Sequence, residues 1–151
     1  MDKPEGITSH DAVQRVRRAL RIRSAGHTGT LDPFATGLLV VLLGRATRLA
    51  RFVEAQAKTY HAVARLGVRT DTDDRTGEVM EERPVERLDA GEVRRALEGF
   101  LGPGRQRPPA YSAKHVDGER SYRLARRGIA AELPATPVTV HRIELVSYGS
   151  N

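Results

Sequence analysis

The sequence predicts an α+β protein, because clear helix signals and clear strand signals occur at different places along its 151 residues. The first helix is expected from about residue 10 to residue 20, where an apolar row follows the hydroxyls of Thr8 and Ser9. The first strong strand signal is the run of six apolar residues at 38–43, which stands between two glycines. A run of this kind is typical of a strand buried on both faces of a sheet.

Further elements follow in the same alternating manner. An apolar row at 46–53 predicts a second helix, and alternation at 59–66 predicts a half-exposed strand. A third helix begins at Asp89, which forms a capping box with Glu92, and we expect the glycines and proline at 102–104 to end it.

The last third of the chain carries weaker signals. Two prolines favour an extended segment at 105–114, and the Asp-Gly pair at 117–118 is typical of a hairpin or turn. We expect a short basic helix near 122–127 and a β-rich segment at 138–148. The length fits one domain or part of one.

Composition limits the class of protein. Lys and Arg number 25 against 19 acidic residues, giving a net charge of +6, and there is no cysteine. Arginine-rich clusters favour a polyanionic partner, since guanidinium groups bind phosphates and stack on bases. No apolar run is long enough for a membrane span, and the start of the chain is unlike a signal peptide. We therefore expect a cytoplasmic protein that does not bind membranes.

Asp32 is the residue that most needs an explanation. It lies in a loop with three glycines in twelve positions, 26–37, and Pro33 fixes the backbone directly after it. An Asp-Pro pair by itself is a common turn initiator. Here the loop also leads into the apolar run at 38–43, so we expect a partly desolvated carboxylate of the kind found at functional sites.

The sequence of this region, GHTGTLDPFATGLLVVLLGRATRL at 26–49, resembles the catalytic motif of the TruB-type tRNA pseudouridine synthases. The resemblance extends over essentially the whole chain, in the order of the family. It includes DKPEGITSHD at 2–11, KTY at 58–60, TDTD at 70–73 and PPAYSA at 108–113. The family implies an α+β fold with a mixed, mainly antiparallel sheet flanked by helices.

The resemblance also implies a reaction and a partner. It makes the chain a pseudouridine synthase that flips and isomerises a uridine in the TΨC stem-loop of tRNA, without a cofactor or metal and as a monomer. Asp32 becomes the essential catalytic residue, acting as nucleophile or as proton acceptor. The substrate-binding residues implied by the family motifs and the adjoining basic patch are His27, Tyr60, Thr30, Leu31, Arg45 and Lys58. Tyr60 would stack on the target base, and Lys3 with Pro4 would support the catalytic loop.

The family pattern continues beyond the part that residues 1–151 match. Its members go on to a segment whose arginine pairs with the catalytic carboxylate, and most add a PUA domain. We therefore expect residues 1–151 to form part of a catalytic domain, incomplete at the C-terminus and without a PUA domain.

The same residues allow other interpretations. A non-catalytic RNA-binding module or tRNA chaperone would keep the fold and the basic surface without turnover. A glycosidase-like hydrolase would need two carboxylates flanking a pocket, and only Asp32 has a suitable context. The acidic stretch at 71–74 lacks the glycine of a calcium loop, and the five histidines do not have ligand spacing, so no metal site is expected.

Overall fold

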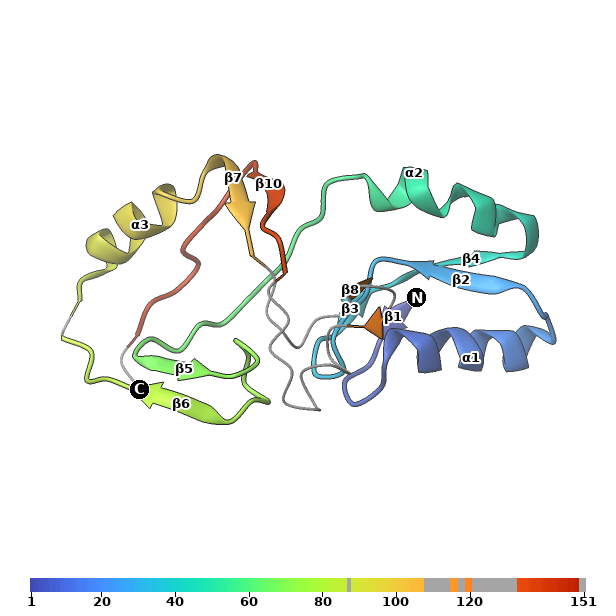
Figure 1. The fold of residues 1–151 in the computed structure, drawn as a ribbon, viewed down its shortest axis with the longest axis horizontal. Coiled ribbons are helices and arrows are strands. Elements are labelled where there is room, and N and C mark those ends of the chain that lie inside the picture. Colours follow the sequence, from blue (N-terminus) through green and yellow to red (C-terminus); the bar gives the residue numbers. More distant parts are fainter. Residues whose placement is uncertain (87, 108–114, 117–118, 121–132, 150–151) are drawn as a thin grey trace. The chain divides into compact units, whose positions relative to one another are not determined.

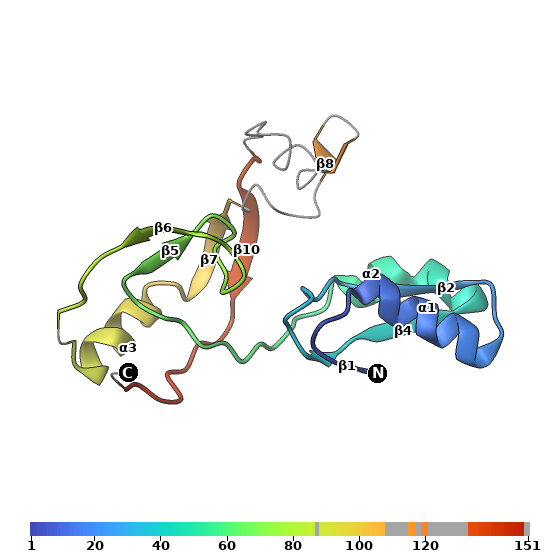
Figure 2. The ribbon, with the colours of Figure 1, turned by 90° about the horizontal axis from the view of Figure 1, so that it is seen from below.

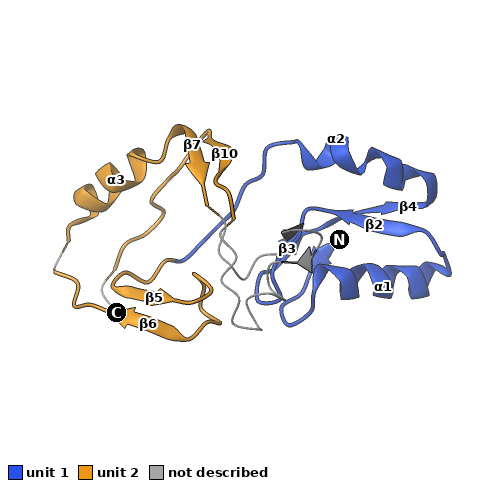
Figure 3. Cartoon of the chain, in the orientation of Figure 1, with its two compact units in different colours: residues 1–63 blue, residues 64–151 orange. Residues whose placement is uncertain are grey.

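The computed structural model describes residues 1–86, 88–107, 115–116, 119–120 and 133–149. The chain divides into two compact units, residues 1–63 and 64–151 (Figure 3). The expected extended segment at 105–114 is described only as far as Arg107, and the expected helix near 122–127 lies outside the described residues. None of the helices in the described part of the chain has the length and hydrophobicity needed to span a bilayer.

The first unit is a β-hairpin placed between helices. Strand β2 (Ala25–Thr28) pairs antiparallel with β4 (Val40–Leu43), and β1 (Asp2–Lys3) pairs with β3 (Gly37–Leu38). Helix α1 (Ser9–Leu20) lies on one face of the β2–β4 hairpin. The 3₁₀ helix η1 (Gly44–Leu49) and helix α2 (Ala50–Glu54) lie on the other face (Figures 1 and 2).

Helix α1 confirms the expected helix and its cap. Thr8 is the N-cap, its hydroxyl accepting from the Asp11 amide at 3.1 Å, and the Asp11 carboxylate accepts from the Thr8 amide at 3.0 Å. Ala12 and Val13 are buried against the hairpin. The sequence places this cap correctly because it depends on residues only three positions apart.

The expected buried strand at 38–43 is wrong in one respect. Only Leu39 is buried, whereas Leu38 is 78% exposed and Leu43 is 40% exposed. The run is also divided, because Leu38 pairs with Asp2 while the next ladder begins at Val40. Each ladder described has two strands, so every strand in it lies at an edge, and its side chains stay more exposed than those of a central strand in a parallel sheet.

The second unit contains strands β5 (Val68–Thr70), β6 (Val79–Glu82), β7 (Gly102–Gln106) and β10 (Thr136–Val140), together with helix α3 (Ala90–Glu98). Strand β5 pairs with β6, and β7 pairs with β10, both antiparallel. Strands β8 (His115–Val116) and β9 (Glu119–Arg120) pair antiparallel, and the Asp-Gly pair at 117–118, where a hairpin or turn is expected, lies outside the described residues. The α+β class is confirmed, with every ladder among the described residues antiparallel.

Two expectations for the middle of the chain are corrected, and one is confirmed. Helix α3 has the expected capping box of Asp89 and Glu92, but it ends at Glu98, and residues 102–104 belong to β7. The expected strand at 59–66 is not a strand, because its residues are exposed and join no ladder among the described residues. Alternation predicts which side chains a strand would bury, but the partner strand must come from elsewhere.

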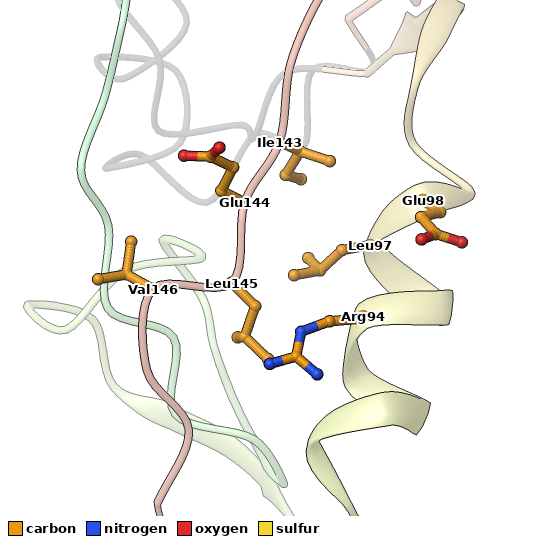
Figure 4. Close-up of a pocket in the computed structure, with 7 residues that line it drawn as sticks. All are labelled: Arg94, Leu97, Glu98, Ile143, Glu144, Leu145 and Val146. Carbon is orange, nitrogen blue, oxygen red and sulfur yellow. The ribbon is translucent and has the colours of Figure 1, made fainter.

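The C-terminal segment shows the same dependence on a partner. Only its first part forms a ladder, as β10, and residues 141–149 are not part of a strand. Ile143 and Leu145 point toward α3, where Leu97 faces them across a pocket of about 460 Å³, while Glu144 and Val146 point away (Figure 4). This pocket belongs to the second unit.

Candidate active site

The Asp32 loop connects the two strands of the β2–β4 hairpin, and the pair formed by Thr28 and Val40 closes it. Two of its glycines adopt backbone conformations that other residues rarely take, with φ of 76° at Gly29 and 118° at Gly37. Gly26 is different, because it pairs with Leu42 as an ordinary residue of β2. The wider conformational range of glycine is therefore needed at two of the three positions, Gly29 and Gly37.

Hydrogen bonds from neighbouring segments hold the backbone of the loop at three alternate residues. The amide of Gly29 donates to the Glu54 carboxylate at 3.2 Å, at the end of α2. Leu31 is held by Ser9, whose hydroxyl accepts from the Leu31 amide at 2.9 Å and donates to its carbonyl at 3.1 Å. The carbonyl of Pro33 accepts from the Gly6 amide at 2.8 Å.

Lys3 provides a buried support beneath the loop. Its side chain is fully buried, and its ammonium group donates to the carbonyls of Pro4 and Ile7 at 2.9 Å and to that of Pro33 at 3.4 Å. A buried ammonium group requires such partners, because an unpaired charge is costly to remove from water. The geometry agrees with the supporting role that the family resemblance implies for Lys3.

Asp32 itself is exposed, which corrects the expectation of partial desolvation. Its carbonyl accepts from the Ala35 amide at 3.0 Å, so the turn favoured by the Asp-Pro pair is present. A turn and a functional carboxylate are compatible here, because the turn uses the backbone of Asp32 and leaves its side chain at the surface. No ion pair to Asp32 is found among the residues that the structure describes.

His27 and Lys58 both lie beside Gly29, where the loop begins. The Nδ1 atom of His27 is 2.7 Å from the Gly29 carbonyl, and since a carbonyl only accepts, Nδ1 carries the hydrogen. The Lys58 ammonium donates to the carbonyls of Glu54 at 2.6 Å and Gln56 at 3.4 Å, which caps the end of α2. Lys58 therefore has a structural contact as well as its expected binding role.

The other expected site residues are placed less closely around Asp32. Leu31, which Ser9 holds, is half-buried, and Thr30 beside it is exposed. Tyr60 is 70% exposed in the segment after α2, and Arg45 is exposed on η1. Within the described residues, neither Tyr60 nor Arg45 has a hydrogen bond to the loop.

Exposed guanidinium groups surround this unit. Those on α1 and just after it are Arg15, Arg18, Arg21 and Arg23, and those on η1 and α2 are Arg45, Arg48 and Arg51. Arg17 belongs by sequence to the same arginine-rich cluster, but it is half-buried and donates to the Ala25 carbonyl at 2.6 Å. Its bond joins α1 to β2, so we correct its assignment from the basic surface to the framework.

Sequence reasoning missed the roles of Ser9 and Glu54. Ser9 was expected to help cap α1, yet Thr8 does this and Ser9 holds a loop residue 22 positions away. Glu54 had no distinguishing pattern. Contacts between residues so far apart leave no periodic signal in a single sequence.

The geometry defines an α+β domain that presents one carboxylate on a loop fixed through its backbone. The solved structure titled "Crystal Structure of a Cbf5-Nop10-Gar1 Complex" has a similar fold, with a TM-score of 0.60 and 23% identity. That match covers 98% of this chain and 34% of the other. At this level of identity the likeness concerns the fold alone.

The family model of the TruB family pseudouridylate synthase (N terminal domain) matches residues 17–151, and the chain belongs to this family. A tRNA pseudouridine synthase B of Nitrosococcus oceani is 49% identical over 151 residues, which are 100% of this chain and 49% of that protein. The protein of the same name from Methylococcus capsulatus is 46% identical over 151 residues, or 67% of its length. The chain spans about half the length of the Nitrosococcus protein and of other curated relatives that it matches.

Proposed function

We propose that this chain is the N-terminal part of the catalytic domain of a tRNA pseudouridine synthase. Its substrate is a uridine in the TΨC stem-loop of tRNA, and Asp32 is the essential residue. We place the enzyme in the cytoplasm, as a monomer. The names of the relatives support this proposal, since proteins called tRNA pseudouridine synthase B match the full length of the chain.

The observation that carries the proposal is the position of Asp32 on the anchored loop. Conversion of uridine to pseudouridine breaks the bond from ribose C1′ to uracil N1, turns the base, and joins C1′ to C5. This reaction needs an anionic group that meets the sugar or the base in a fixed orientation. An exposed carboxylate on a loop held at Gly29, Leu31 and Pro33 can provide that group, as a nucleophile or as a proton acceptor.

The remaining residues are assigned supporting roles. A uridine must leave its stack before its C1′ and C5 atoms can be reached, and an exposed aromatic ring can stack on the extruded base. We assign that role to Tyr60, whose hydroxyl is also a candidate acceptor of the C5 proton. His27 helps to hold the extruded nucleotide, with Thr30, Leu31 and Lys58 along the loop. Arg45 and the other exposed arginines bind the phosphate backbone.

Tritium release from tRNA labelled at uridine C5 tests the proposal, using the full-length protein that contains this sequence. Asp32→Asn keeps the size of the side chain but removes its charge. We expect the release rate to fall at least a thousandfold, the order of loss typical for a nucleophile, with tRNA affinity nearly unchanged. Asp73→Asn is the matched control, since Asp73 is another exposed aspartate, in the second unit.

Each outcome has a distinct meaning. More than a tenth of the wild-type rate in Asp32→Asn would refute the role of Asp32. Binding of tRNA by the wild-type protein without tritium release would instead favour the non-catalytic RNA-binding module.

A further inference from the structure

The hydroxyl of Ser9 lies beneath the residue that precedes Asp32. Ser9 is 2% exposed, and its hydroxyl oxygen both accepts from the Leu31 amide at 2.9 Å and donates to the Leu31 carbonyl at 3.1 Å. One side chain thus satisfies both backbone polar groups of Leu31. The orientation of the peptide that leads into Asp32 is fixed as a result.

Ser9 is itself held rigidly. It is the first residue of α1, and the capping box of Thr8 and Asp11 fixes the backbone around it. The hydrogen bond from the Thr8 hydroxyl, followed by that from its amide, lowers the pKa of the Asp11 carboxyl, so this cap is intact at neutral pH. Ala12 and Val13, one helical turn further on, are buried.

The loop is held on both sides of Asp32. Ser9 holds the residue before it, while Lys3 and the Gly6 amide hold the carbonyl of Pro33 after it. A loop that kept only one of these supports could rotate about the support that remained. The orientation of the carboxylate therefore depends on Ser9 as well as on the lysine beneath the loop.

We propose that Ser9 is a positioning residue for Asp32 in the isomerisation proposed above, on which this inference rests. Ser9 acts through the backbone of Leu31 and does not contact the substrate. Displacing a reacting group by about 1 Å can reduce a rate by about a hundredfold. Loss of the Ser9 hydroxyl is therefore expected to lower the rate of the chemical step more than the affinity for tRNA.

The test compares three variants of the full-length protein with wild type. Ser9→Ala removes the hydroxyl, Ser9→Thr keeps it, and Thr8→Ala removes the neighbouring hydroxyl that caps α1 without contacting the loop. Single-turnover tritium release gives the chemical rate, and tRNA binding gives the affinity. Hydrogen exchange of the Leu31 amide, followed by NMR, reports separately whether the bond to residue 9 is formed.

We expect Ser9→Ala to release tritium about 30 to 100 times more slowly than wild type, with tRNA affinity within about twofold, because the carboxylate is displaced while the binding surface is not. Its Leu31 amide should exchange faster. Thr8→Ala should keep the rate within about threefold, because its lost bond belongs to the helix cap. Ser9→Thr should recover the rate of tritium release to the extent that it restores slow exchange of the Leu31 amide. If Ser9→Ala does not fold, the rate and the Leu31 exchange of Ser9→Thr still test the inference.

Three results would overturn the inference while leaving the proposed function intact. These are an unchanged rate in Ser9→Ala with fast Leu31 exchange, an equal loss of rate in Thr8→Ala, or rates that do not follow Leu31 exchange across the variants. A wild-type protein that releases no tritium would refute the proposed function itself. The Leu31 exchange would still report whether Ser9 holds the loop.

Discussion

Replacing Lys3 by methionine tests how much the buried ammonium group contributes to the first unit. The side chain is fully buried, and its three acceptors are the carbonyls of Pro4, Ile7 and Pro33. Methionine is similar in length and apolar, so Lys3→Met fills the same space without providing any hydrogen bond. The Pro33 carbonyl keeps the Gly6 amide as a donor, at 2.8 Å.

The expected loss of stability follows from the two carbonyls that remain without the lysine. Each lost hydrogen bond to the ammonium group costs about 1–3 kcal/mol, so two of them give about 2–6 kcal/mol, with the lower values where water can reach the carbonyl, as at the exposed Pro4. Removing a buried charge recovers part of this, since the ammonium group no longer has to be desolvated. We expect a net destabilisation of about 2–3 kcal/mol, near the lower end of that range.

Native-state hydrogen exchange of the β2 and β4 amides measures this loss in the first unit. A chain with two compact units need not unfold in one step, and exchange resolves the opening of each unit separately. Lys58→Met is the matched control, because Lys58 is exposed and also donates to two backbone carbonyls. The control should lose less than about 1 kcal/mol, since water replaces its bonds. Equal losses in the two variants would show that burial of Lys3 has no special effect.

Two further predictions concern charge. The slope of log Kd for tRNA against log salt should be about 3 if some four phosphates are neutralised, and Arg48→Gln should reduce it by about 1. Arg17→Gln should leave the slope unchanged, because the Arg17 guanidinium donates to the Ala25 carbonyl. An equal reduction of the slope in both variants would contradict the assignment of Arg48 to the binding surface and of Arg17 to the framework. For Asp74, burial acts to raise the pKa, but hydrogen bonds from Thr76 and Thr72 outweigh it and hold the pKa below its ordinary value. The stabilisation is then present above about pH 4 and lost as the pH falls through the lowered pKa, so Asp74→Asn should flatten the acid dependence of stability. Acid titration of the second unit by hydrogen exchange measures it, and an unchanged dependence would contradict the assignment.

The features that the sequence predicted best depend on neighbouring residues. The capping box of Asp89 and the cap hydroxyl of Thr8 each join residues three apart, and both are present. In such cases the chemistry of a short stretch largely decides its conformation.

The predictions that failed depend on partners distant in the sequence. The alternation around Tyr60 is a real strand pattern, but a strand also requires a neighbour to accept its backbone hydrogen bonds. Leu38 is exposed although five apolar residues follow it, since burial depends on which layers cover a strand. For the candidate site, the loop of Asp32 was identified from its motif, whereas the anchors at Ser9 and Glu54 were not. Those anchors lie 22 and 25 residues from the atoms they hold.

The anchors of the loop act on main-chain groups, which every amino acid except proline possesses in full. The shape of the loop therefore depends little on which side chains occupy its exposed positions. Thr30 can change without breaking any of the bonds at Gly29, Leu31 or Pro33. Mutation and selection can vary the residues beside Asp32 while its framework persists. Libraries that diversify Thr30 should yield mostly folded proteins, which makes this position a practical starting point for altering substrate preference.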